Sequence, residues 1–136
     1  MKKNNFSSIQ DIIKIVKKNG MFILVDDESK HEEMENEGDL VISTSAVNPK
    51  NINFMAKYAR GLICLAMDSA QSKKLDLTLA SPINQSRSKT AFTYSIEAKK
   101  GVTTGISAYD RSRTIKVCLL YTSDAADEED SVDLGG

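Results

Sequence analysis

The stretch MFILVDDESKHEEMENEGDLVIST, residues 21–44, places a dense acidic segment between two apolar runs. Each apolar run, MFILV at residues 21–25 and LVIST at residues 40–44, is short and rich in β-branched side chains, which predicts a strand, with MFILV buried. Between them, eight carboxylates occur in residues 26–39. The stretch therefore predicts two strands joined by an acidic connection that needs a separate explanation.

Helix start signals alternate with further strand patterns along the chain. Ser8, Asn48, Asp68 and Ser107 each stand where an N-cap would begin a helix, and Pro49 occupies a favoured first helical position. GLICLAM at residues 61–67 and TAFTYSIEA at residues 90–98 indicate two more strands, the former buried. Interleaved helices and strands predict an α/β (α+β) fold, with a layered mixed sheet flanked by helices.

The last nineteen residues differ from the rest of the chain. Residues 118–136 carry six acids and no base, with small residues and a glycine end. This composition predicts an acidic tail without a core role, either disordered or non-native, after a single domain part at residues 1–117. CLLYTSDAADE and SVDLGG also resemble translated sequencing-adapter DNA.

Charge and cysteine usage narrow the function classes. Residues 1–117 carry five more bases than acids, which fits an anionic small molecule such as a phosphate. The lysines are scattered without interleaved aromatics, so we expect no nucleic-acid partner. No apolar run approaches the roughly 20 residues needed to cross a bilayer, and no signal peptide is recognisable, so we expect a cytoplasmic protein with free thiols and no membrane partner.

The strongest candidate site lies in ENEGD. Glu35, Glu37 and Asp39 alternate, and alternate side chains of an extended backbone project to one face. Carboxylates held together favour a hard cation such as Mg²⁺, which takes oxygen ligands. A solvated acidic loop explains the same residues about equally well. GVTTGIS at residues 101–107 offers a weak phosphate cradle at a helix start, and Cys64 is expected to pack in the core.

Several motifs in series resemble one family. VDDE, ENEGDL, INFMAKYARGLICLAM, LDL, TAFTYSIEA and GVTTGISAYDRSRTI are similar, in this order, to the 3,4-dihydroxy-2-butanone 4-phosphate synthases of riboflavin biosynthesis, over residues 9–115. The resemblance implies an α/β fold with a mixed sheet, a homodimer, and Mg²⁺ or Mn²⁺ as cofactor. It implies a metal-dependent carbon–carbon lyase that converts D-ribulose 5-phosphate into L-3,4-dihydroxy-2-butanone 4-phosphate and formate.

The resemblance also assigns roles to individual residues. Glu35 matches a metal ligand that contacts substrate, and Asp39 matches a substrate-binding aspartate. Glu37 and Asp26 match catalytic acids of the same pocket, and Cys64 matches a cysteine that lines it.

The chain departs from the family pattern in three places. Residues 29–34, SKHEEM, make the acidic connection four residues longer and put Met34 where a substrate-binding arginine belongs; Lys89 replaces a glycine. The RxGHTE-type motif, which supplies the second metal ligand and the phosphate contacts, is absent from these 136 residues. We therefore expect an N-terminal part of a synthase with little or no activity. The alternatives are a noncatalytic interaction module that uses the acidic loop, and a metal-dependent enzyme acting on another sugar phosphate.

Overall fold

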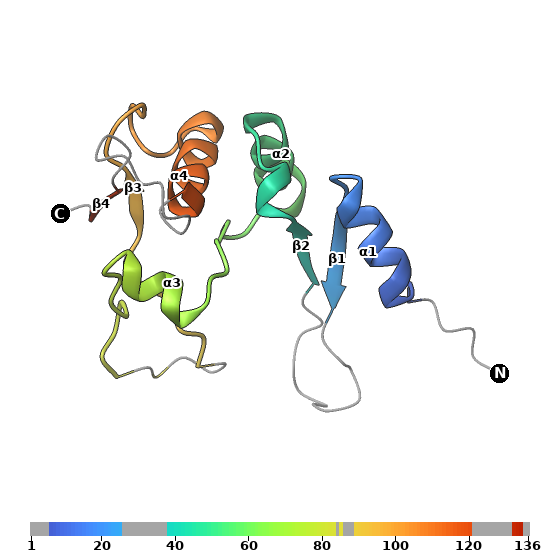
Figure 1. Cartoon of the computed structure of the whole chain (residues 1–136), viewed down its shortest axis with the longest axis horizontal. Coiled ribbons are helices and arrows are strands. Elements are labelled where there is room, and N and C mark those ends of the chain that lie inside the picture. The colour runs from blue at the N-terminus through green and yellow to red at the C-terminus, as the bar shows by residue number, and fades with distance from the viewer. Residues whose placement is uncertain (1–5, 26–37, 84, 86–88, 121–131, 135–136) are drawn as a thin grey trace.

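Helices and strands alternate along the protein, as Figure 1 shows for a computed structural model that describes residues 6–25, 38–83, 85, 89–120 and 132–134. The α/β class is confirmed. The elements are α1 (Ile9–Lys17), β1 (Met21–Val25), β2 (Gly38–Ile42), the 3₁₀ turn η1 (Thr44–Ala46), α2 (Pro49–Phe54), the π-helical turn η2 (Met55–Ala59), α3 (Ser69–Lys74), β3 (Ile96–Ala98), α4 (Ala108–Leu120) and β4 (Val132–Leu134).

The two strands that flank the acidic connection pair with each other. β1 and β2 are antiparallel, with Met21 opposite Ile42 and Val25 opposite Gly38. The strand at residues 21–25 is confirmed, and the second is confirmed with other bounds, because β2 includes Gly38 and Asp39 but not Ser43 and Thr44. The prediction that MFILV is buried is wrong. Ile23, Leu24 and Val25 are exposed, and because strand side chains point out of the two faces of a sheet, this means that the faces of the β1–β2 pair are not covered there.

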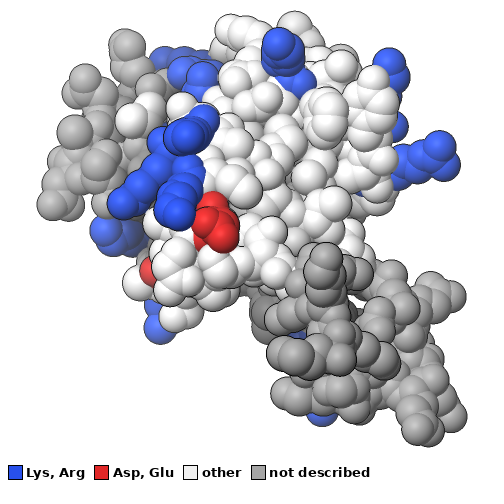
Figure 2. Space-filling model, turned by 90° about the vertical axis from the view of Figure 1, so that its right-hand side faces the viewer, with Lys and Arg blue, Asp and Glu red and all other residues white. Residues whose placement is uncertain are grey.

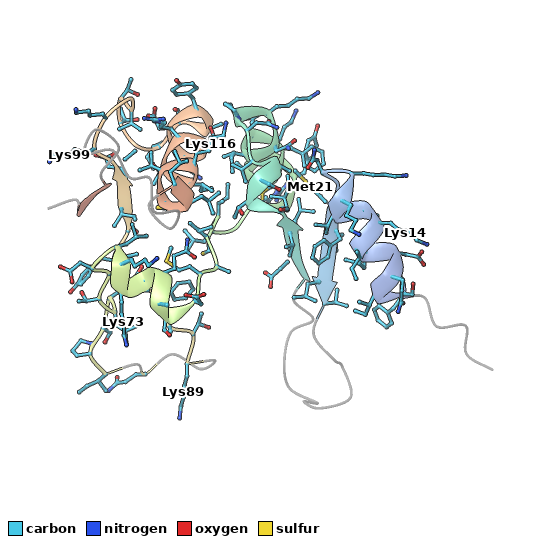
Figure 3. The ribbon with its side chains drawn as sticks, viewed as in Figure 1. Lys14, Met21, Lys73, Lys89, Lys99 and Lys116 are labelled. Atoms are coloured by element: carbon cyan, nitrogen blue, oxygen red, sulfur yellow. The ribbon has the colours of Figure 1, made fainter. Side chains whose placement is uncertain are left out.

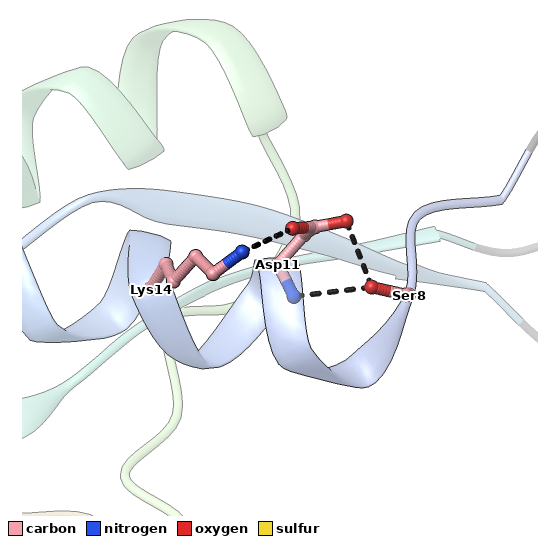
Figure 4. Close-up of polar contacts among 3 residues, drawn as sticks. All are labelled: Ser8, Asp11 and Lys14. Atoms are coloured by element: carbon pink, nitrogen blue, oxygen red, sulfur yellow. Dashed lines mark hydrogen bonds and ion pairs between the residues drawn. The ribbon is translucent and has the colours of Figure 1, made fainter.

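The helices begin at the residues that the sequence marks as caps. In Figure 4, Ser8 Oγ accepts a hydrogen bond from the Asp11 amide at 3.2 Å and donates to the Asp11 carboxylate at 2.7 Å. Lys14 adds an ion pair to the same carboxylate at 3.0 Å, and these two contacts, Ser8 first, lower the pKa of Asp11. Asn48, Asp68 and Ser107 cap α2, α3 and α4 in the same way.

Two predicted strands are wrong in whole or in part. Residues 61–67 form no strand, and of residues 90–98 only β3 does, with one isolated bridge between Leu79 and Thr93. A strand exists only where a neighbour supplies hydrogen-bond partners, and the described residues form two separate antiparallel pairs, β1–β2 and β3–β4. Residues 61–67 have the sequence pattern of a strand, but no strand among the described residues pairs with them.

The core lies where α2 packs against α4 (Figure 1). Ile52 of α2 and Val117 and Cys118 of α4 are each only 1% exposed. Among the described residues, the other buried apolar side chains are Ala46, Val47, Leu75 and Ala98. Cys118 thus has a core role that the sequence did not indicate, one residue past the predicted boundary at 117, and α4 runs on to Leu120. That residues 118–136 are non-native or disordered remains a prediction.

The lysines are spread over the molecule. Of the lysines labelled in Figure 3, Lys14 lies on α1, Lys73 on α3 and Lys116 on α4, whereas Lys89 and Lys99 lie between elements. On the face in Figure 2, basic side chains surround a broad area that has few charges. Within the part of the chain that the structure describes, no helix has the length and apolarity needed to cross a membrane.

Candidate functional site

Asp39 is the one predicted carboxylate of the acidic site that the structure describes. It lies in β2, opposite Leu24 of β1, and its side chain is exposed. Gly38 precedes it and pairs with Val25. Asp39 is therefore exposed to solvent near the start of β2, where the strand follows the acidic connection.

The other predicted acids, Asp26, Glu35 and Glu37, lie outside the described residues. No group of three or more His, Cys, Asp or Glu side chains among the described residues is arranged to hold a metal ion. Asp39 is an oxygen donor of the kind that hard cations take, but one carboxylate does not make a metal site. The described residues alone therefore do not fit a bound cation.

Cys64 lies in the irregular segment 61–67, where the core role expected for it is wrong. Its side chain is exposed and lines a hollow of about 230 Å³. Because residues 61–67 do not enter a sheet, their side chains are not covered from both faces. The hollow also has Phe92, Tyr94 and Cys118 in its wall.

Two hollows are lined by described residues, and Cys64 lines the first of them. Asp39 does not line the hollow that contains Cys64, nor the second hollow between the α1–β1 turn and α2. The shared pocket implied by the family resemblance remains a prediction, because Asp26, Glu35 and Glu37 lie outside the described residues.

Asp110 binds the TTG loop, which we define as Thr103–Thr104–Gly105. Asp110 is buried in the first turn of α4. One oxygen, Oδ2, accepts hydrogen bonds from Thr103 Oγ1 at 2.9 Å, the Thr104 amide at 3.2 Å and the Gly105 amide at 3.1 Å. A carboxylate of the chain itself thus occupies the donors that the sequence offered as a phosphate cradle.

Gly105 is required at this point of the loop for two reasons. Its φ is +74°, which side chains with a Cβ rarely adopt. A Cβ at this position would also overlap the carboxylate of Glu97 on β3. The sequence marked Ser107 as the cap of this helix, but it did not predict that Asp110 binds the loop or that Glu97 lies beside Gly105, because neither arrangement follows from local spacing.

The loop hydrogen bonds make Asp110 sensitive to acid. Burial alone would raise the pKa of Asp110, but hydrogen bonds from Thr103, Ser107 and Thr104 outweigh it and hold the pKa below its usual range. A lowered pKa in the folded state means that the ionised carboxylate stabilises the fold above its unfolded-state pKa. This stabilisation is lost as the pH falls through the folded-state pKa.

We expect Asp110→Asn to loosen the TTG loop, because the asparagine side chain has a donating NH₂ group in place of one acceptor oxygen of the carboxylate. Hydrogen exchange of the Thr104 and Gly105 amides should accelerate, and the unfolding free energy should depend less on pH below about pH 4. Exchange by mass spectrometry and chemical denaturation at several pH values measure the two effects. Unchanged exchange at both amides, with Asp68→Asn as the matched exposed control, would contradict the role of Asp110.

The two cysteines should differ sharply in reactivity. Burial raises the pKa of the Cys118 thiol to about 11, so roughly one thiol in a thousand is ionised at pH 8. Cys64 is exposed. We expect one thiol per native chain to react with a disulfide reagent at pH 8, and two in denaturant. Single Cys64→Ser and Cys118→Ser variants assign the signal, and equal native rates for both thiols would contradict the burial of Cys118.

Comparison with known proteins assigns the family. The sequence model of the 3,4-dihydroxy-2-butanone 4-phosphate synthase family matches residues 10–131, which is most of the chain. The chain belongs to this family. The resemblance read from the motifs is thereby confirmed, and the match also runs past the boundary predicted at residue 117.

Individual members of the synthase family are similar to this chain in sequence and in structure. The 3,4-dihydroxy-2-butanone 4-phosphate synthase of Photobacterium phosphoreum is 46% identical over 121 residues, which are 89% of this chain but 32% of that protein. A synthase crystal structure in complex with two magnesium ions has a TM-score of 0.78 at 30% identity, covering 93% of this chain and 56% of that one. RibBX, a two-domain synthase from A. baumannii, has a TM-score of 0.75 at 37% identity, covering 96% and 36%.

The extent of these matches bears directly on function. The chain spans about a third of the length of the P. phosphoreum synthase and little more than half of the magnesium-bound synthase. The fold of the synthase family is therefore shown for this chain over part of the length of these relatives.

Proposed function

We propose that this chain is part of a 3,4-dihydroxy-2-butanone 4-phosphate synthase of riboflavin biosynthesis, which converts D-ribulose 5-phosphate into L-3,4-dihydroxy-2-butanone 4-phosphate and formate. The observation that carries the proposal is the family match over residues 10–131. The solved relatives support it with TM-scores of 0.75 and 0.78. The complete protein is proposed to be a cytoplasmic homodimer.

In this proposal the acidic connection holds the reacting end of the substrate. Glu35 would hold a divalent cation, Mg²⁺ or Mn²⁺, and contact the substrate, and Asp39 would bind substrate from the start of β2. The cation, when bound, polarises carbonyl and hydroxyl groups. Glu37 and Asp26 transfer protons as general acids and bases, and Cys64 lines the pocket. The relative that was solved with two magnesium ions supports a divalent cation.

The chain by itself should be inactive or nearly so, because the RxGHTE-type motif is absent from its sequence. Incubation of the purified chain with Mg²⁺ and D-ribulose 5-phosphate should release formate at the background rate. The comparison is a joined chain, in which residues 1–117 continue into the part of the P. phosphoreum synthase that follows the residue aligned with Val117. Formate release by the 136-residue chain at the rate of the joined chain would refute this prediction.

Metal binding distinguishes the enzyme from a noncatalytic module. In the joined chain, titration calorimetry with Mg²⁺ and Mn²⁺ should show weaker binding for the double variant Glu35→Gln, Asp39→Asn. Asp68→Asn is the matched control, because Asp68 is an exposed carboxylate that only caps α3 and asparagine caps equally well. Metal binding unchanged in the double variant, with loss of a protein partner, would instead support the module. A panel of other sugar phosphates as substrates tests the remaining alternative, which is a metal-dependent enzyme acting on another sugar phosphate.

A further inference from the structure

The second hollow, of about 420 Å³, lies between the α1–β1 turn and the helical segment formed by α2 and η2. Met21, labelled in Figure 3, lines it from the start of β1. We propose that this hollow binds a small phosphate ester that carries an aromatic ring, such as a nucleoside monophosphate. The inference does not rest on the proposed function, because neither Asp39 nor Cys64 lines this hollow.

The charge of the wall favours an anion. Among the described residues that line the hollow, two are lysines and none is acidic: Lys50 stands in the first turn of α2, and Lys57 in η2. Within the part of the chain that the structure describes, neither lysine has an ion pair. Both ammonium groups are exposed and are therefore available to a phosphate, which lysine commonly binds.

Two aromatic rings border the same hollow. Phe54 and Tyr58 are 44% and 61% exposed, and their ring centroids are 4.7 Å apart with an interplanar angle of 46°. Lys57 Nζ lies 5.1 Å from the centroid of the Tyr58 ring. An exposed ring beside a cation offers a planar base a surface to stack on, with a charge for its phosphate nearby.

The helical backbone brings these groups to one side. Lys50, Phe54 and Tyr58 are spaced four residues apart, which places their side chains on the same side of a helix. η2 is a π-helical turn, in which the Arg60 amide donates to the carbonyl of Met55, five residues earlier, at 3.2 Å. Such turns are frequent at functional sites.

The size and the remaining polar groups agree with a nucleotide. About 420 Å³ falls within the roughly 300–1,000 Å³ of most small-molecule pockets. Asn19 and Asn53 also line the hollow, and an amide side chain can donate to and accept from a base edge or a ribose hydroxyl. An inorganic anion would make no use of the rings, and an apolar ligand would displace water from the lysines without replacing its hydrogen bonds.

The experiment is titration calorimetry of the 136-residue chain with AMP, adenosine, ribose 5-phosphate and inorganic phosphate. We expect AMP to bind about fivefold or more tightly than each of the others, because only AMP has both a ring and a phosphate. Ribose 5-phosphate or inorganic phosphate that binds as tightly as AMP overturns the role of the rings. Adenosine that binds as tightly overturns the role of the lysines, and no binding of AMP overturns the whole proposal.

The double variant Lys50→Gln, Lys57→Gln locates the charges. AMP binding should weaken roughly tenfold, because two exposed ion pairs with the phosphate are lost. The matched control is Lys73→Gln, Lys74→Gln, which removes the same charge from exposed positions on α3 outside the hollow. Equal affinity in the two double variants overturns the proposal, since attraction by net charge alone would then explain the binding.

Tyr58→Leu keeps an apolar side chain, removes the ring, and should weaken AMP binding roughly fivefold or more. Tyr109→Leu is its control, because Tyr109 is 62% exposed on α4 and does not line the hollow. Equal affinities in these two variants also overturn the proposal.

The joined chain separates this site from the proposed reaction. Saturating D-ribulose 5-phosphate should leave its affinity for AMP unchanged, and displacement of AMP by this substrate overturns the proposal. AMP binding without formate release would uphold the second hollow as a ligand site while refuting the proposed function.

Discussion

Glu35→Gln in the joined chain should lower formate release from D-ribulose 5-phosphate by about 10²–10⁴-fold, the range that a positioned carboxylate contributes to proton transfer and metal-assisted catalysis. The substitution keeps the shape of the side chain and removes its charge. Glu35 alternates with Glu37 and with Asp39, and Asp39 lies at the start of β2. Formate is measured under saturating Mg²⁺, so that lost cation affinity and lost rate are separated.

The control for this prediction is Asp68→Asn, which removes an exposed carboxylate from the cap of α3. Its formate release should equal that of the unsubstituted joined chain. If Glu35→Gln loses no more activity than Asp68→Asn, the acidic connection is only a solvated loop. The exposed position of Asp39 is compatible with both explanations, so this comparison decides between them.

Ile52→Ala should remove much of the stability of the 136-residue chain. Ile52 is 1% exposed at the contact of α2 with α4, and truncating such a side chain costs about 2–5 kcal/mol. Small domains have only about 5–15 kcal/mol in total. The structure buries few large side chains among its described residues, which places this chain toward the lower end. Denaturant unfolding followed by circular dichroism measures the loss.

Two variants calibrate that loss. Ile52→Val should cost about 0.5–1.5 kcal/mol, because only one methyl group is removed from the same site. Ile9→Ala should change stability by no more than about 0.5 kcal/mol, because Ile9 is exposed. Equal losses for Ile52→Ala and Ile9→Ala would show that the contact between α2 and α4 is not the core.

Local features of the fold were predictable from the sequence. Ser8, Asn48, Asp68 and Ser107 bind amides three residues further along, and a contact over three residues depends on side-chain type and spacing alone. The pair of strands around the acidic connection was predictable for a similar reason. MFILV and LVIST are apolar, β-branched and close in sequence.

Features that need a distant partner were not predictable. Residues 61–67 have the pattern of a strand, but no strand among the described residues pairs with them. The pattern of a segment does not reveal whether a pairing strand is present. The same lack of cover leaves Ile23 and Cys64 exposed. The contacts of Asp110 with Thr103 and Gly105 depend on how the loop folds back onto α4, which no local spacing encodes.

For the candidate site, the sequence was sufficient to identify the family but not to establish the role of each residue. The motifs identified the family, and the match over residues 10–131 confirmed it. The roles of Asp26, Glu35, Glu37 and Asp39 remain predictions, because only Asp39 lies in the described residues.

The most direct test is formate release by the joined chain with Mg²⁺ and D-ribulose 5-phosphate, measured beside the 136-residue chain under the same conditions. The account predicts formate and L-3,4-dihydroxy-2-butanone 4-phosphate in equal amounts from the joined chain, and only background from the shorter one. A joined chain that is folded by circular dichroism, binds Mg²⁺ and still releases no formate would contradict the account.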